Sequence, residues 1–547
     1  MLPLPDGGWS ARTVLTPTAF KVRGLALMPS NSVIPVVVVP GIMGSNLRAK
    51  RQPRSREEYN QEAKPGKPVW RPPNTMVGGL WDALAWDRVS PDRRQKLFSP
   101  ATLEVDEDGP PHIPHRDGRL HVHPTLARER GWGELHADSY GGLLCALETS
   151  LNRTFQHDEA TGERHIQRHW QEVMACDPKK WGMPGMMPLT EAALEKHARH
   201  HYPVYGVGYN WLECCEQASI RLERRILDII EYWKGMRRQC ERVILVTHSM
   251  GGLVARACAK RIPDRIAGVI HGAMPALGAP AAYRRMSCGT EAQDFAGRFV
   301  AKILGATTYD TTPVLATSPG ALELLPTHLY PGSWLHVRVV HAPGPAGGPE
   351  TAIDYLHLPN EAAPNPYDLY RDLRPWYRLV DPELADPAGK FRKSPGGVAE
   401  EIRTAIDTAE RFHRECLGDY YHPNTYAFYG SDAGQPAFGH VRCLGRKETG
   451  QGTALTPANI KNAKLSGREP GGVRLVDVDP VCSLSFKPEP PDARGDRTVP
   501  FQSGAGPAGK VQHLFETRGY DHQGAFNHED MLMLTLRLVV RIVQGMP

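Results

Sequence analysis

The sequence has few features of a membrane, nucleic-acid-binding or disulfide-rich protein. No uninterrupted apolar run approaches roughly 18 residues, so no membrane-spanning helix is expected. The net charge is only +5 over 547 residues, and no basic amphipathic run carries interleaved aromatic residues, which argues against a nucleic-acid partner. The ten cysteines are scattered without a Cys-x-x-Cys pair, so buried free thiols are expected, although a disulfide formed after export stays open.

The first eight residues have neither a basic segment nor an apolar one, so no secretory signal peptide is predicted. Synthesis in the cytoplasm is expected. The composition, with 41% hydrophobic and 23% charged residues, is typical of a soluble globular protein. Glycine and proline number 53 and 49, which predicts long loops.

The most informative stretch surrounds Ser249. Residues 243–246 are apolar and rich in β-branched side chains, which predicts a buried parallel strand. A tight turn carries Ser249, and apolar residues at helical spacing follow it. This is the pattern of a nucleophile elbow, so Ser249 is the predicted nucleophile and the Met250 backbone N–H one oxyanion donor. Thr247 departs from the usual glycine of this turn, and the alternative is that Ser249 only caps the helix.

An earlier stretch predicts the second oxyanion donor. Residues 34–40 form another β-branched apolar run, and it ends in a Pro-Gly-x-x-Gly turn at residues 40–44. Lipases place an oxyanion donor in such a loop, where glycines let the backbone approach the site closely. We assign this donor to the backbone N–H of Ile42, with Met43 as the alternative. An ordinary strand-to-loop turn is the other interpretation.

Several segments resemble the lecithin:cholesterol acyltransferase-like branch of the α/β-hydrolases: residues 36–47, 209–211, 247–252 and 277–280. Within that branch, the chain is most similar to the bacterial type VI secretion lipase effectors, the Tle phospholipases. Further support comes from residues 169–174, 202–211, 248–256, 283–285, 314–326, 367–370 and 376–380. The resemblance implies an α/β-hydrolase fold with a mostly parallel central sheet, flanking helices and a large inserted cap.

The remaining catalytic groups follow from this resemblance. The Gly-Asp-x-Thr-Val-Pro segment at residues 495–500 resembles the acid loop of the family, which makes Asp496 the orienting carboxylate. Residues 511–515 predict a final strand and residues 531–543 a closing helix. The base of this fold lies between these two elements, so His522 is predicted, with His528 in the first helical turn as the alternative. The poorer candidates for the acid are Asp477, Asp479 and Asp492.

The domain organisation is expected to have three parts. Residues 1–30 form an irregular N-terminal extension, and residues 31–280 with 470–547 form the hydrolase core, which includes a loop-rich insertion at about 50–135. Residues 281–470 form a cap or lid, and its glycine-rich stretches at 434–452 and 467–472 are expected to be mobile loops. Four histidines of the insertion are interpreted as surface residues, and a metal site is the alternative, although no second set of ligands lies nearby in the sequence; they are His112, His115, His121 and His123.

The expected activity is phospholipase A-type hydrolysis of membrane phospholipids through an acyl-enzyme. An acyltransferase or thioesterase with the same triad is one alternative, and a non-catalytic binding module on a hydrolase fold is another. No cofactor is needed for the triad; a Ca²⁺ requirement stays open, although nothing in the sequence supports it. The resemblance also implies export by type VI secretion into the periplasm of a target cell, a cognate immunity protein, a VgrG- or PAAR-type spike or adaptor, and transient membrane contact.

Overall fold

The computed structural model describes residues 30–72, 89–111, 113, 122–157, 163–290, 305, 307–341 and 350–546, and the backbone alone of 2–3, 9–14 and 23–28. His112, His115 and His121 lie outside the described residues. The ten cysteines all lie inside them; none forms a disulfide, and nine are buried. No helix among the described residues has the length and apolar character needed to cross a membrane.

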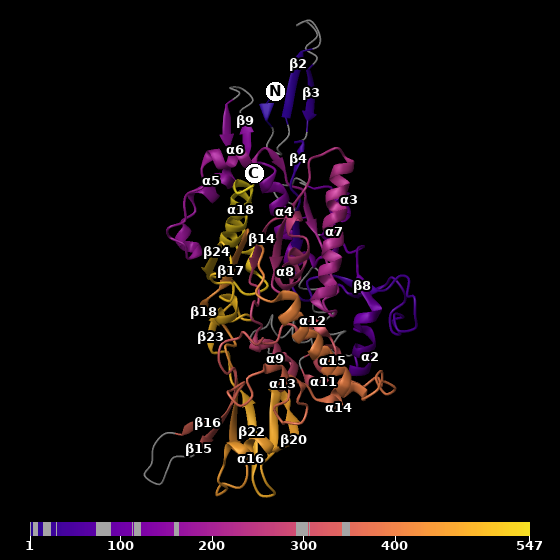
Figure 1. Ribbon diagram of the computed structural model, residues 1–547, viewed down its shortest axis with the longest axis vertical. Coiled ribbons are helices and arrows are strands. Elements are labelled where there is room, and N and C mark those ends of the chain that lie inside the picture. Colours follow the sequence, from indigo (N-terminus) through magenta and orange to yellow (C-terminus); the bar gives the residue numbers. More distant parts are fainter. Residues whose placement is uncertain are drawn as a thin grey trace.

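A six-stranded sheet forms the centre of the molecule (Figure 1). Every neighbouring pair in it is parallel. The strands are, in spatial order, β12 (Val204–Gly206), β5 (Val36–Val39), β13 (Val243–His248), β14 (Ile266–Gly272), β17 (Thr425–Gly430) and β24 (His513–Thr517). The α/β class predicted from the apolar runs is confirmed, because β5, β13, β14 and β17 are buried along their whole length, as strands covered on both faces must be.

Helices cover both faces of this sheet. Alternate side chains of β5 and β13 point to opposite faces, as the pleat requires. On one face, Val38 and Val246 join a core with α4 (Ala137–Leu151) and α18 (Glu529–Gln544). On the other face, residues such as Val37 join a core with α7 (Cys215–Gly235) and α8 (Gly251–Arg261).

A second six-stranded sheet lies at one end of the molecule, below the central sheet in Figure 1. Its strands are, in spatial order, β16 (Thr351–Leu358), β15 (Leu335–His341), β19 (Val441–Lys447), β22 (Ser483–Pro488), β21 (Val473–Asp477) and β20 (Lys464–Glu469). Only β15 and β19 pair in parallel. Around it are α9 (Pro280–Cys288), α11 (Thr308–Leu315), α12 (Pro319–Leu322), α13 (Pro366–Arg371), α14 (Pro382–Ala385), α15 (Gly397–Arg411) and α16 (Pro457–Asn462). We call this sheet with its helices the cap.

The predicted cap limits of 281–470 were wrong in two places. β17 lies inside that range but belongs to the central sheet, whereas β21 and β22 lie beyond residue 470 but belong to the cap. The chain therefore leaves the core twice, and a linear reading cannot show that a short buried run such as β17 returns to it. The expected mobile loop at 434–452 is instead largely strand, namely β19 and part of β18 (Asp432–Ala437), which pairs with β23 (Ala493–Gly495).

The N-terminal segment was predicted to be irregular, and this prediction was wrong. The segment contains a three-stranded sheet of β1 (Leu2–Pro3), β2 (Trp9–Val14) and β3 (Arg23–Met28). β2 and β3 pair along their whole length, although neither alternates cleanly between apolar and polar residues. The insertion at 50–135 contributes β7 (Pro68–Trp70), α2 (Pro91–Leu97), β8 (Leu103–Val105) and α3 (Pro124–Glu129). Shorter elements are β4 (Ser32–Val33), β6 (Leu47–Ala49), β9 (Phe155–His157), β10 (Arg164–Ile166), α5 (Arg168–Ala175), α6 (Glu191–His197), β11 (His200–His201) and α17 (Phe501–Gly504).

Candidate active site

Ser249 lies at the turn between β13 and α8. Its φ of 53° places it in the left-handed region, which non-glycine residues seldom adopt and which is common at functional turns. The turn is tightly packed: a Cβ at Gly251 would lie 2.4 Å from the carbonyl oxygen of Pro40, and one at Gly252 would lie 2.5 Å from the sulfur of Met274. The two glycines therefore let the start of α8 lie close against the end of β5 and against Met274.

Thr247 replaces the usual small residue of this turn, and the structure shows how it fits. The residue is fully buried within β13. Its hydroxyl lies 2.7 Å from Nδ1 of His271 on the neighbouring strand β14. The polar atom is thus satisfied inside the sheet, so the departure from the motif leaves the elbow intact.

The structure brings Ser249, His522 and Asp496 together. Nε2 of His522 lies 2.8 Å from Oγ of Ser249, and Nδ1 lies 2.8 Å from Oδ2 of Asp496. The other carboxylate oxygen accepts hydrogen bonds from the backbone N–H groups of Thr498, at 3.1 Å, and Val499, at 2.7 Å. Asp496 is 1% exposed. A buried carboxylate held in this way can orient the imidazole and stabilise its protonated form.

Asp496 and His522 lie on two neighbouring loops at the ends of strands. Asp496 follows β23 directly, beside the end of β17, where a Cβ at Gly430 would lie 2.8 Å from that of Asp496. His522 lies in the loop between β24 and α18, and its backbone N–H donates to the carbonyl oxygen of Asp496 at 2.7 Å. One short contact between the two loops therefore fixes the base relative to the acid.

The alternative residues lie elsewhere. His528 was predicted to lie in the first turn of the last helix but is the N-cap residue of α18. Its ring packs beside that of Tyr520, with centroids 6.0 Å apart. Asp492 forms an ion pair with His440 at 2.7 Å, and Asp477 accepts a hydrogen bond from Ser466 at 3.0 Å. Asp479 accepts hydrogen bonds from backbone groups of its own turn. None of these side chains has a hydrogen bond to Ser249 or His522.

The loop after β5 lies directly against Ser249. A Cβ at Gly41 would lie 3.0 Å from Cβ of Ser249. Met43 has a φ of 63°, which turns the chain sharply at this point. The backbone N–H groups of Ile42, Met43 and Met250 donate to no other described residue. The geometry therefore leaves both Ile42 and Met43 available as oxyanion donors beside Met250.

The cap covers this edge of the central sheet. Ser249 is only 4% exposed. A Cβ at Gly320 of α12 would lie 2.9 Å from Cε of Met250, and the backbone N–H of Ala279 donates to the carbonyl oxygen of Leu324 at 2.9 Å. Ile42 packs against the apolar clusters of both core and cap. Ser249 thus lies buried at the junction of core and cap.

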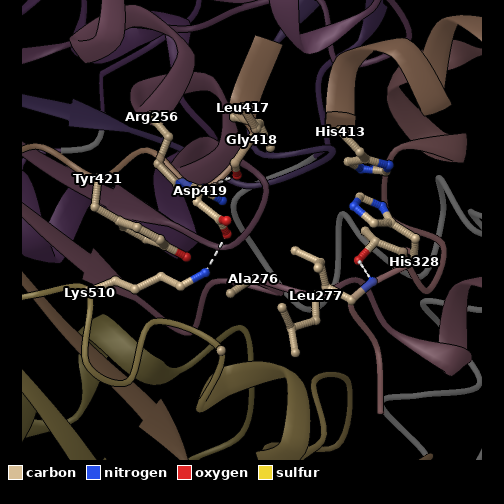
Figure 2. A pocket seen from close by; sticks show the side chains of 13 residues that line it. Arg256, Ala276, Leu277, His328, His413, Leu417, Gly418, Asp419, Tyr421 and Lys510 are labelled. Carbon is tan, nitrogen blue, oxygen red and sulfur yellow. Dashed lines mark hydrogen bonds and ion pairs between the residues drawn. The ribbon is translucent and has the colours of Figure 1, made fainter. Parts of the chain in front are cut away.

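A separate pocket with an empty volume of about 350 Å³ lies beside α8 (Figure 2). Arg256 is 5% exposed there, and it donates to the carbonyl oxygens of Tyr420 and Gly418, both at 3.0 Å. Its guanidinium also lies 4.0 Å from the ring centroid of Tyr421. Lys510 forms an ion pair with Asp419 across the pocket. Ser249, Asp496 and His522 do not line this pocket. Its charged side chains already bind other groups of the pocket wall, so we interpret the pocket as a packing interface between α8 and the cap.

The described part of the chain holds no group of three or more His, Cys, Asp or Glu side chains placed to bind a metal ion. The structure also reveals a contact near Ser249 that the sequence did not predict. Tyr140 of α4 bonds to the backbone N–H of Gly41 and to His248, one residue before the nucleophile. Nothing in the spacing of α4 predicts this contact, because it joins residues about a hundred positions apart, such as Tyr140 and His248 with a separation of 108.

Comparison with known proteins agrees with this fold. The family model of the PGAP1-like alpha/beta domain matches residues 215–297, which include the elbow. A chain from the crystal structure of the Tle4–Tli4 complex is 28% identical, with a TM-score of 0.72, and the match covers 94% of this chain and 99% of that one. The resemblance to the Tle effectors is confirmed. No curated protein sequence matches the chain significantly. The similarity extends over core and cap together, so both belong to the shared hydrolase architecture.

Proposed function

We propose that the protein is a serine lipase that hydrolyses the carboxylic ester bonds of membrane phospholipids. The observation that carries the proposal is the unbroken chain of hydrogen bonds from Ser249 through His522 to Asp496. It starts at a turn whose left-handed backbone exposes the serine oxygen to the base. A serine that only capped a helix would need no such partners.

The geometry supports the following reaction. His522 removes the proton of the Ser249 hydroxyl as the oxygen attacks the ester carbonyl, and Asp496 stabilises the resulting imidazolium. The backbone N–H groups of Met250 and Ile42 bind the tetrahedral oxyanion; losing one such donor typically costs about 3 kcal/mol. His522 then gives its proton to the departing alcohol. Water, activated by the same imidazole, releases the acid and restores Ser249.

Two observations favour a lipid substrate over a small soluble ester. The nucleophile lies beneath the cap, at an apolar junction. There Ile42 of the core packs against the apolar cluster of the cap, and Leu324 of the cap packs against an apolar cluster of the core. The chain also resembles a Tle effector over nearly its whole length. Acyl chains withdrawn from a bilayer require such an apolar environment, and movement of the cap at a membrane surface would admit them.

The similarity to a protein solved as the Tle4–Tli4 complex supports a biological role. We propose that the protein is a type VI secretion effector that acts on phospholipids in the periplasm of a rival cell and is neutralised in its own cell by an immunity protein. Delivery would use a VgrG- or PAAR-type spike or an adaptor. Ca²⁺ has no assigned part in this reaction, because the triad supplies the nucleophile and both proton transfers.

The direct test is covalent labelling with a fluorophosphonate, which reacts with activated serines, followed by mass spectrometry of the peptides. The wild-type protein should carry one adduct, on Ser249, and His522→Ala should react far more slowly. Absence of reaction, or reaction at another serine while Ser249 stays free, would overturn the assignment.

An alcohol acceptor added to an ester-hydrolysis assay separates hydrolysis from acyl transfer, because a transferase would form the new ester at the expense of free acid.

A further inference from the structure

A buried relay of hydrogen bonds runs behind the catalytic residues. The backbone N–H of Gly41 donates to the hydroxyl of Tyr140 at 2.9 Å. That hydroxyl lies 2.8 Å from Nδ1 of His248, and Nε2 of His248 lies 2.8 Å from the carbonyl oxygen of His522. The relay therefore begins in the oxyanion loop, passes beside the nucleophile and ends on the backbone of the base.

With a neutral His248, only one arrangement of protons satisfies all three contacts. The amide of Gly41 can only donate, so the Tyr140 oxygen accepts from it and its own hydrogen is directed to Nδ1 of His248. A carbonyl oxygen can only accept, so Nε2 of His248 carries the hydrogen given to His522. His248 is thus fixed as one neutral tautomer, and each of its ring nitrogens has a partner.

Burial keeps this relay uncharged. It lowers the pKa of His248 to about 3 and raises the pKa of the Tyr140 hydroxyl. The rings of His248 and His522 are 5.1 Å apart, and the charge of Asp496 raises the pKa of His248 by less than burial lowers it. A charged His248 would oppose the imidazolium that forms at His522 during the reaction, whereas the neutral ring does not.

The first turns of α4 hold both sides of the relay. The carbonyl oxygen of Gly44, in the oxyanion loop, accepts a hydrogen bond from the backbone N–H of His136 at 2.8 Å, and a Cβ at Gly44 would lie 2.8 Å from the Tyr140 ring. On the other side, Oγ of Ser139 accepts from the side-chain amide of Gln523, the neighbour of His522, at 3.0 Å. One short helical segment therefore contacts the loop of the oxyanion donors and the loop of the base.

We propose that Tyr140 and His248 are positioning residues, which lock the oxyanion loop and the His522 loop into one geometry around Ser249. This inference rests on the proposed function. Neither residue touches the reacting atoms. Their effect is on how accurately the base and the oxyanion donors are placed, and small errors of placement reduce turnover strongly. Loss of the relay should therefore lower kcat and leave KM nearly unchanged.

The first test is Tyr140→Phe, which deletes the hydroxyl alone. We expect kcat on a short-chain ester to fall about tenfold to hundredfold, with KM within about twofold of the wild type. Tyr202→Phe is the control: Tyr202 belongs to the same apolar core and loses one buried hydrogen bond, from its hydroxyl to the carbonyl oxygen of His197 at 2.9 Å, whereas Tyr140→Phe loses two. The kcat of Tyr202→Phe should stay at the wild-type level, although both variants should lose thermal stability.

The second test replaces His248. Gln places an amide N–H near the position of Nε2 and can still donate to His522, so His248→Gln should retain most of the kcat; His248→Leu has no donor and should lose about a hundredfold. Equal rates for these two variants, or an unchanged kcat in Tyr140→Phe, would overturn the positioning role. If the wild-type protein itself hydrolyses no ester and binds no fluorophosphonate, the proposed function fails instead, so the two failures are distinct.

Discussion

The central sheet and the cap sheet contain the same number of strands but are built in different ways. All six residues of β13 are buried, and its neighbours β5 and β14 are equally enclosed. In the cap, β15 and β19 alternate between buried and partly exposed positions, so that only one face is fully covered. A sheet enclosed on both faces offers substrates only the ends of its strands, and Ser249, Asp496 and His522 all lie at this edge.

This difference separates two tasks. The core places the reacting groups on short loops at strand ends, where a few hydrogen bonds fix them. The cap has its own apolar cluster, built around large side chains such as Trp334 and Trp376, and it meets the core where Ser249 is buried. We therefore expect changes in the core to alter the chemistry on every substrate, and changes on the cap surface to alter which substrates reach it.

The largest effect should follow removal of the nucleophile. Ser249→Ala should lower hydrolysis of both short esters and phospholipids by roughly 10⁴-fold or more, because triad members act as a unit. Its circular dichroism and unfolding temperature should match those of the wild type. Near wild-type hydrolysis of a short ester by this variant would show that the reaction occurs elsewhere.

Substitutions of the histidines at positions 522 and 528 should differ just as clearly in their effect on activity. His522→Ala should lose about as much activity as the serine variant, since it removes the only imidazole bonded to Ser249 among the described residues. His528→Ala should keep most of its activity, because that ring packs beside Tyr520 at the start of α18. Steady-state kinetics on a short ester checks both variants, and the reverse ranking would exchange their roles.

A smaller loss of activity should follow when a single methyl group is added to the oxyanion loop. Gly41→Ala places a Cβ 3.0 Å from that of Ser249 and 3.3 Å from Nδ1 of His248, so the loop must shift and kcat should fall about tenfold to hundredfold. Gly142→Ala is the control: it lies in α4, where the new Cβ would meet only Asn527 at 3.5 Å. That variant should keep full activity and gain up to about 1 kcal/mol of stability. Equal kcat values for the two would mean that the loop has no part in catalysis.

Charged substitutions on the surface should distinguish cap from core. Tyr309 and Leu329 are exposed apolar residues of the cap, and Tyr232 is an exposed apolar residue on α7 of the core. Tyr309→Asp and Leu329→Asp should reduce phospholipid hydrolysis about tenfold while sparing short esters, because an apolar surface at the membrane is lost. Tyr232→Asp should affect neither substrate. Equal losses on both substrates in the cap variants would assign the cap a purely structural role.

The smallest predicted effect concerns acid stability. Burial lowers the pKa of His197, His248 and His271 in the core to about 3, below the ordinary value of 6.5. Between about pH 3 and 6.5 the unfolded chain binds protons that the folded core does not, so stability is greatest above pH 6.5 and falls as pH decreases. Hydrogen exchange at pH 7.5 and 5.0 should show a larger loss of protection in β13 and β14 than in β15 and β19. A uniform loss would contradict the contrast between the sheets.

Local patterns explain which features the sequence could predict. The strand–turn–helix around Ser249 and the glycine turn at residues 41–44 are contiguous, so their backbone shape follows from neighbouring residues. His522 was predictable from its place between the last strand and the last helix. Asp496 required the resemblance to a known acid loop, because an isolated Asp in a loop has no distinguishing pattern.

The remaining features depend on contacts between distant residues. β17 pairs with β14 and β24, and its short apolar run does not reveal whether it joins the core or the cap. Tyr140 approaches His248 only because α4 packs across the oxyanion loop. The strands near residues 434–452 contain glycine and charged residues that hide their alternation. Register and packing, which follow from the whole fold, decide these cases.

The most direct test of the central claim is mass-spectrometric analysis of the lipid products after purified protein is mixed with phosphatidylglycerol vesicles. We predict equal amounts of free fatty acid and lysophospholipid from the wild-type protein, and neither product from Ser249→Ala. Release of the phosphorylated headgroup, or the same products from the serine variant, would contradict an ester hydrolase that acts through Ser249.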